Sequence, residues 1–127
     1  MITATRLIQS SFVYILAIIA IILTVVGQIL VKLGVNTIES FVISLPMLVR
    51  AFTDWRIIIG FSLAFAGSIF WLGVIAKLPF SIAYPMLSLN YVFSLIAARY
   101  VFHEQIPPWR IAGTIVICFG VIMAVRQ

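Results

Sequence analysis

Long uncharged stretches bounded by charged residues constrain this sequence more than any other feature. Arg6 and Lys32 enclose 25 uncharged residues. Three further uncharged stretches, at 57–76, 78–98 and 111–125, are 20, 21 and 15 residues long. Because a helix needs about 20 mostly apolar residues to span a bilayer, the pattern predicts a membrane protein with four spans.

The composition supports this prediction and excludes several other classes of protein. Hydrophobic residues make up 65% of the chain and charged residues only 9%, whereas a soluble domain is nearer half apolar and a quarter charged. A soluble enzyme, a nucleic-acid module and a disulfide scaffold are therefore excluded. The basic residues that give the net charge of +5 lie at the expected membrane boundaries and do not form a nucleic-acid-binding patch. Cys118 is the only cysteine, so no intrachain disulfide can form.

We expect an all-α transmembrane fold, a four-helix bundle formed as a single domain over residues 1–127. The expected helices lie at about 11–31, 57–76, 81–98 and 107–125. Between the first two, apolar residues at helical spacing around Pro46 predict a short interfacial helix at about 38–52 or a re-entrant connection. The alternative is that this segment forms the first turns of the second span.

The basic residues leave the membrane orientation open. Four helices place Arg6, Lys77 and Arg126 on one side and five basic residues on the other. Three against five is a small bias under the positive-inside rule. It slightly favours the longer loops in the cytoplasm, and insertion in both orientations stays possible.

The positions of the acidic residues argue against a cation-coupled exporter. Such a transporter needs a carboxylate within the membrane, but Glu39, Asp54 and Glu104 all lie at or beyond the ends of the predicted helices. The sequence also contains no metal-ligand cluster, no nucleophile–base arrangement and no phosphate-cradling loop. We therefore expect neither an enzyme nor a metal or cofactor site.

Neutral polar residues at membrane depth are the candidate site. In the first helix, Thr24 and Gln28 are one turn apart on one face, and Lys32 is another turn along. This set indicates either side chains that join two helices or a cavity that holds a polar headgroup, with Lys32 facing its phosphate.

The third helix carries a second polar set. Tyr84, Ser88 and Tyr91 share one stripe, Asn90 lies on another, and Pro85 should bend the helix. A bent polar helix beside small-residue helices is typical of a cavity between spans. The alternative is a tightly packed bundle in which the hydroxyls bond back to their own helix.

Small residues predict close contacts between helices. The second span has several, and Gly113 and Gly120 lie seven residues apart on one face of the fourth. Such faces allow helices to approach closely, either within the chain or between subunits. Since four helices enclose little volume, we expect a dimer in which Gly113 and Gly120 are the contact.

Residues 82–92, with the sequence IAYPMLSLNYV, resemble the third-helix signature of the small EamA-like subunits of the aminoarabinose-phosphoundecaprenol flippase. The resemblance extends back through Trp71 to Gly27, Gln28 and Lys32, and forward through His103 and Glu104 to the glycines of the fourth helix. It implies a multi-pass protein of the bacterial cytoplasmic membrane. It also implies a partnership with a related four-helix subunit or a second copy.

The chain more distantly resembles the small multidrug resistance exporters of the same drug/metabolite transporter superfamily. Those carry an essential Glu three residues before the glycine that matches Gly27, and this sequence has Thr24 there. The departure removes the proton-binding group of drug antiport. The resemblance to the flippase subunits remains, and it implies a half-transporter fold.

We therefore expect translocation of a polyprenyl-phosphate-linked sugar, such as undecaprenyl-phosphate aminoarabinose. The alternatives are a small-solute or drug exporter of the same superfamily and a non-transporting accessory subunit. Lys32 and Arg99 are the expected contacts of the phosphate. The expected contacts of the sugar are Thr24, Gln28, Tyr84, Ser88, Asn90 and Tyr91.

Overall fold

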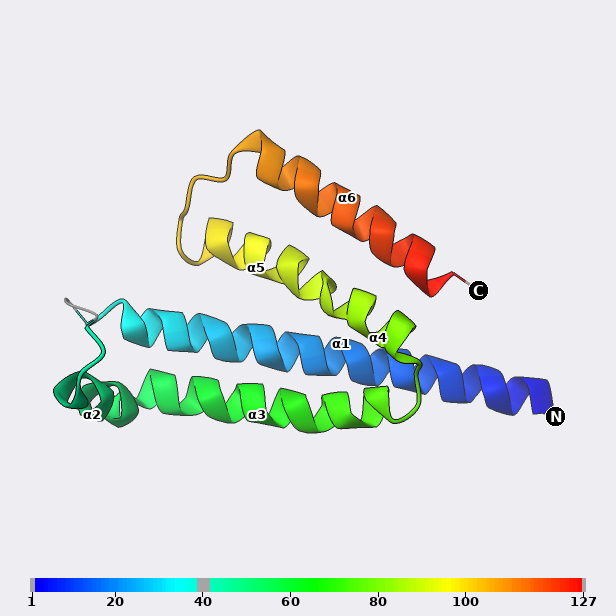
Figure 1. The fold of residues 1–127 in the computed structure, drawn as a ribbon, viewed down its shortest axis with the longest axis horizontal. Helices are drawn as coiled ribbons and strands as arrows, with labels where there is room; N and C mark the ends of the chain where they lie inside the picture. The colour runs from blue at the N-terminus through cyan, green and yellow to red at the C-terminus, as the bar shows by residue number, and fades with distance from the viewer. Residues whose placement is uncertain (1, 39–41, 127) are drawn as a thin grey trace.

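The computed structural model describes residues 2–38 and 42–126, and all regular secondary structure within them is helical. This part of the chain forms six helices, whose arrangement can be followed in Figure 1. Their bounds are α1 Ile2–Val35, α2 Leu45–Thr53, α3 Trp55–Ile75, α4 Phe80–Leu87, α5 Leu89–Tyr100 and α6 Pro108–Val125. The prediction of an all-α fold is confirmed.

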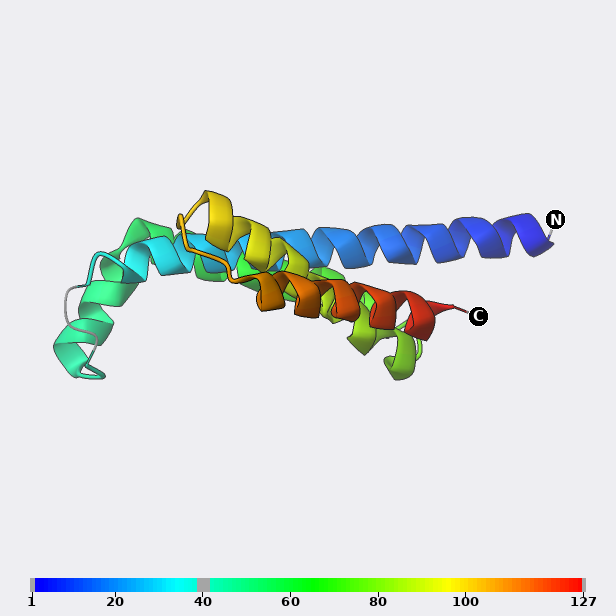
Figure 2. The ribbon, with the colours of Figure 1, turned by 90° about the horizontal axis from the view of Figure 1, so that it is seen from above.

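Four segments of the described chain are long and apolar enough to cross a membrane: Gln9–Val35, Trp55–Ile75, Phe80–Tyr100 and Pro108–Val125. Figures 1 and 2 show them side by side, in the order α3, α1, α4 with α5, and α6. The N-terminal end of α1 and the C-terminal end of α6 lie at the same end of the molecule, as Figure 1 shows. The chain is therefore a multi-pass, four-helix membrane protein.

Two helices differ from their expected bounds. α1 begins at Ile2 and ends at Val35, beyond the expected 11–31 on both sides. A long basic side chain can remain in a helix and still reach water, so Arg6 and Lys32 need not end it. The segment expected as an interfacial helix at 38–52 contains α2, which begins only at Leu45. Part of that expectation, residues 39–41, lies outside the described residues.

The start of α2 and the start of α3 follow from local chemistry. Pro46 lies in the first turn of α2, where a missing N–H breaks no hydrogen bond. Asp54 caps α3 by accepting from the Arg56 main-chain N–H at 2.9 Å, and its side chain pairs with the Arg56 guanidinium at 3.3 Å. Hydrogen bonding to the Arg56 side chain, and then to its backbone, lowers the pKa of Asp54 below its usual range.

Helices α1 and α3 pack with their backbones in direct contact. A Cβ built on Gly27 would overlap the Gly60 carbonyl oxygen and lie 2.9 Å from the Ala64 nitrogen. Farther along the same pair of helices, a Cβ built on Gly67 would lie 2.6 Å from the Thr24 hydroxyl oxygen. Small residues permit this approach where no hydrophobic force drives helices together in lipid, as the sequence predicts for the second span.

The third span is divided into two helices. Pro85 lies inside α4 and has no N–H for the carbonyl one turn earlier. The helix ends two residues later, and Ser88 separates it from α5. There the hydrogen bonds tighten to three-residue spacing, from the Ser88 N–H to Pro85 and from the Tyr91 N–H to Ser88, both at 3.0 Å. The expected bend is confirmed.

A buried apolar cluster holds α1, α3 and α4 together at the end of the molecule that carries the α3–α4 turn. Its members are Val13, Ala17, Val74, Ala83 and Met86. Helix α6 packs mainly against α4 and α5 and lies at the edge of the layer in Figure 1. Much of its apolar surface therefore stays exposed, as Trp109, Val116 and Met123 show.

Candidate substrate-binding site

A pocket of about 230 Å³ lies between α1 and α5, close to the end of the spans that carries the α5–α6 loop. Three charged or polar side chains of its wall, Gln28, Lys32 and Ser94, come from the two helices, and a fourth, Glu104, comes from the loop. The rest of the wall is apolar: Val25, Ile29, Ala97, Ala98 and Phe102. We call this the Lys32 pocket.

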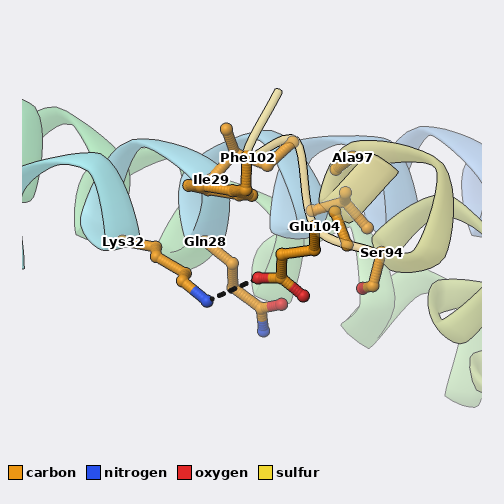
Figure 3. A pocket seen from close by; sticks show the side chains of 9 residues that line it. Gln28, Ile29, Lys32, Ser94, Ala97, Phe102 and Glu104 are labelled. Carbon is orange, nitrogen blue, oxygen red and sulfur yellow. Dashed lines mark hydrogen bonds and ion pairs between the residues drawn. The ribbon is translucent and has the colours of Figure 1, made fainter. Parts of the chain in front are cut away.

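Lys32 has two partners in this pocket. Its Nζ lies 3.1 Å from the Glu104 carboxylate and 5.0 Å from the centre of the Phe102 ring. Figure 3 shows Gln28, Lys32, Ser94 and Glu104 on one side of the pocket, with the dashed line joining Lys32 to Glu104. The Lys32 and Glu104 side chains are 52% and 40% exposed, so an incoming ligand can reach both.

The α5–α6 loop is shaped so that Glu104 reaches α1. His103 has a φ of 52°, the left-handed conformation that few residues other than glycine adopt. The turn lets the Glu104 N–H donate to the Ala98 carbonyl at 2.9 Å, back onto α5. Arg99 also donates to the Glu104 main-chain oxygen, at 3.5 Å. These contacts tie the loop to α5 and leave the carboxylate free to face Lys32.

A second, smaller pocket of about 190 Å³ lies deeper along α1, among α1, α3 and the third span. Thr24, Ser68, Trp71 and Asn90 contribute to its wall. The Thr24 hydroxyl donates to Ala20 of its own helix at 2.8 Å. Thr24 thus has its donor satisfied within α1, and it presents only acceptor capacity to the pocket.

The structure divides the sequence-predicted residues among several places. Gln28 and Lys32 share the Lys32 pocket, with Arg99 beside the loop, whereas Thr24 and Asn90 share the deeper pocket. The other predicted residues of the third span, Tyr84, Ser88 and Tyr91, line neither pocket.

Tyr84 and Tyr91 line neither of these two pockets and are 48% and 47% exposed. Tyr84 instead stacks on Phe80, with ring centres 4.3 Å apart, and meets Trp71 edge-on at 6.5 Å. Ser88 is half-buried at the break between α4 and α5. The two polar stripes of the third span therefore do not converge on one cavity within this chain.

Gly113 and Gly120 lie on the exposed face of α6, away from both pockets. A Cβ on either glycine would find no atom of the described residues within 4 Å. Of the two contacts that the sequence left open, the one within the chain is thus not formed, and the contact between subunits remains a prediction.

Sequence reasoning missed Glu104 and Phe102 as pocket residues. Glu104 is 72 residues from Lys32 in the sequence, and no local spacing links the two. A signal was nevertheless present, since four spans place Lys32 and the 99–108 loop at the same membrane face. Opposite charges at one face of a small protein are candidates for a pair.

Other chemistry has no support among the described residues. They contain no group of three or more His, Cys, Asp or Glu side chains placed to hold a metal ion. The two described carboxylates lie at the start of α3 and in the α5–α6 loop, and Glu39 is outside the described residues. The Lys32 pocket instead offers a cation, a carboxylate, an amide and a hydroxyl, which suit an anionic and hydroxylated ligand.

No protein-family model matches this chain, and no solved structure matches it. Curated proteins from Salmonella newport, Salmonella typhimurium and Salmonella choleraesuis are similar to it, each named "Probable 4-amino-4-deoxy-L-arabinose-phosphoundecaprenol flippase subunit ArnE". Each is 47% identical over 58 residues, which are 46% of this chain and 52% of the relative.

The chain resembles ArnE. This confirms the predicted resemblance to the small flippase subunits, although the chain spans only about half the length of the curated ArnE relatives it matches. ArnE is named as a flippase subunit, which is a transport role and not a catalytic one. This agrees with the expectation that the protein is not an enzyme.

Proposed function

We propose that this protein helps to move a polyprenyl-phosphate-linked sugar between the leaflets of the bacterial cytoplasmic membrane. The observation that carries the proposal is the Lys32 pocket, which joins a cation to neutral hydrogen-bonding groups at the end of apolar spans. The resemblance to ArnE supports the class of substrate.

The two ends of such a lipid have opposite requirements. The phosphate and sugar need polar partners, because drawing a charged headgroup toward the membrane centre costs several kcal/mol at least. The polyprenyl tail needs only apolar surface, which the exposed side chains of the spans provide. A pocket at the membrane face that opens beside apolar helices meets both requirements.

We assign Lys32 to the phosphate and Gln28 and Ser94 to sugar hydroxyls. Arg99, which directly follows Ala98 of the pocket wall, would add a second positive charge near the phosphate. Thr24 and Asn90 of the deeper pocket would receive the sugar as it moves inward along α1. The exposed Tyr84 and Tyr91 and the half-buried Ser88 then fit a role at a surface shared with another subunit.

A translocation assay tests this function. Vesicles containing the purified protein would carry a polyprenyl-phosphate sugar with a fluorescent label on its sugar headgroup. A membrane-impermeant quencher added outside would show which fraction of the label lies in the outer leaflet. We expect the protected fraction to become accessible faster than in protein-free vesicles. Equal rates, together with no such lipid retained when the protein is purified in mild detergent, would refute the proposal.

The alternative function, a drug or small-solute exporter, is not favoured by any specific observation. Cation coupling there needs a carboxylate within the membrane, and the position corresponding to that carboxylate is Thr24. Resistance of cells to quaternary ammonium compounds on overexpression would favour the exporter.

A dimer would complete the path. The open faces around Gly113 and Gly120, on a helix whose apolar surface is largely exposed, suit contact with a second copy or a related four-helix subunit. Replacing both glycines by leucine should leave the monomer folded, since no atom of the described residues lies within 4 Å of a Cβ at either position. It should weaken self-association several-fold. Cross-linking in membranes measures this, and an unchanged dimer yield would place the contact elsewhere.

A further inference from the structure

The Lys32 pocket contains a negative charge that phosphate binding alone does not explain. Glu104 lies in the wall, 3.1 Å from Lys32 and held there by the turn at His103. An anion-binding site is weakened by a carboxylate, because like charges repel and compete for the same cation. The pocket is therefore built for both signs of charge.

The role of the Glu104 carboxylate follows from its competition with an entering phosphate for Lys32. A lipid phosphate that binds Lys32 must share its ammonium with Glu104 or displace the carboxylate from it. If the sugar is neutral, Glu104 is then left beside the phosphate without a cation of its own, and repulsion between the two negative charges weakens binding. Arg99 does not supply that cation here, since it contacts the main-chain oxygen of Glu104 and not the carboxylate.

A headgroup that also carries a protonated amine removes this cost. Its phosphate replaces Glu104 on Lys32, and its ammonium replaces Lys32 on Glu104. Each protein charge then exchanges one partner for another, so neither is left without a charge-assisted hydrogen bond. The amide of Gln28 and the hydroxyl of Ser94 remain available for sugar hydroxyls between the two charged ends.

We propose that Glu104 is a specificity-determining residue, which selects lipid phosphates whose sugar carries a primary amine over those with a neutral sugar. The inference rests on the proposed function and deepens it, since it assigns the discrimination to one side chain. The alternative is a purely structural role, in which the Lys32–Glu104 pair only ties the α5–α6 loop to α1.

Two probes that differ only at the sugar nitrogen test the proposal. One is a short-chain polyprenyl-phosphate amino sugar, and the other is its N-acetylated derivative, which has no ammonium group. We expect wild-type protein in vesicles to bind and move the amino probe about tenfold better, the effect of one charge-assisted hydrogen bond. Glu104→Gln should bind the two probes equally, with the neutral probe bound at least as well as by wild type.

Asp54→Asn is the matched control. It removes one negative charge at the same end of the molecule, beside Gly34 of α1, and asparagine still caps a helix well. Its preference for the amino probe should equal that of wild type. The comparison of the two probes on wild-type protein gives a result even if Glu104→Gln folds poorly.

The outcomes separate the two proposals. If wild type treats both probes alike, or if Glu104→Gln keeps the preference, Glu104 is only a structural residue and the inference is overturned. If wild type neither binds nor moves either probe, the proposed function itself fails, and the role of Glu104 fails with it.

Discussion

Gly27→Val is expected to prevent α1 and α3 from packing, with a loss of about 3 kcal/mol or more of stability. A Cβ at Gly27 meets the Gly60 carbonyl oxygen and the Ala64 nitrogen. Both are main-chain atoms, which cannot rotate away as a side chain can. The helices must separate, and the contacts on which the other spans rest are lost. Thermal unfolding in detergent, and the yield of folded protein, measure the effect.

Gly73→Ala is the matched control for this prediction. Gly73 lies on α3, in the same helix pair, but the nearest atom to a Cβ there is Leu16 Cδ1 at 3.6 Å. That is an ordinary van der Waals distance, and the leucine can adjust. We expect stability close to that of wild type. A Gly27→Val protein that unfolds at the wild-type temperature would show that α1 and α3 do not approach as closely as described here.

Lys32→Ala is expected to slow translocation of a polyprenyl-phosphate sugar by about ten- to a hundredfold, the effect of losing a charge-assisted hydrogen bond to phosphate. Lys32 is the side chain of the pocket wall that carries a positive charge. Lys32→Arg should keep much of the rate because it keeps the charge. The vesicle assay described above provides the measurement, with lipid binding determined in parallel.

Two controls separate the loss of a phosphate contact from damage to the fold. Lys77→Ala removes a positive charge in the α3–α4 turn, away from the Lys32 pocket, and should not change the rate. The double variant Lys32→Ala/Glu104→Gln leaves no unpaired carboxylate in the pocket and should still be slow. Recovery of the wild-type rate in the double variant would mean that Lys32 serves only to neutralise Glu104.

The spans were predictable because bilayer thickness imposes a length on every uncharged stretch. Pro85 likewise predicted the bend of the third span, since the missing N–H acts locally. The extent of α1 was not predictable from charge spacing. Lys32 ends the uncharged stretch, but the helix continues to Val35 because a backbone can stay helical in water as well as in lipid.

The composition of the pocket was less predictable than the fold. Helical periodicity places Thr24, Gln28 and Lys32 on one face, yet it does not say which of them a neighbouring helix covers. Packing against Gly67 directs Thr24 to a separate, deeper pocket. Similarly, Tyr84 shares a stripe with polar residues, but the rings of Phe80 and Trp71 hold it elsewhere. These choices depend on tertiary contacts that have no local signature.

The division of the third span at Ser88 places its two halves in different surroundings. Ala83 and Met86 of α4 are fixed in the apolar cluster with Val13 and Val74, whereas α5 supplies Ser94 and Ala97 to the Lys32 pocket. The packed apolar cluster and the polar pocket therefore draw on opposite ends of one interrupted span. A change at the pocket end need not be carried along an unbroken helix to the cluster.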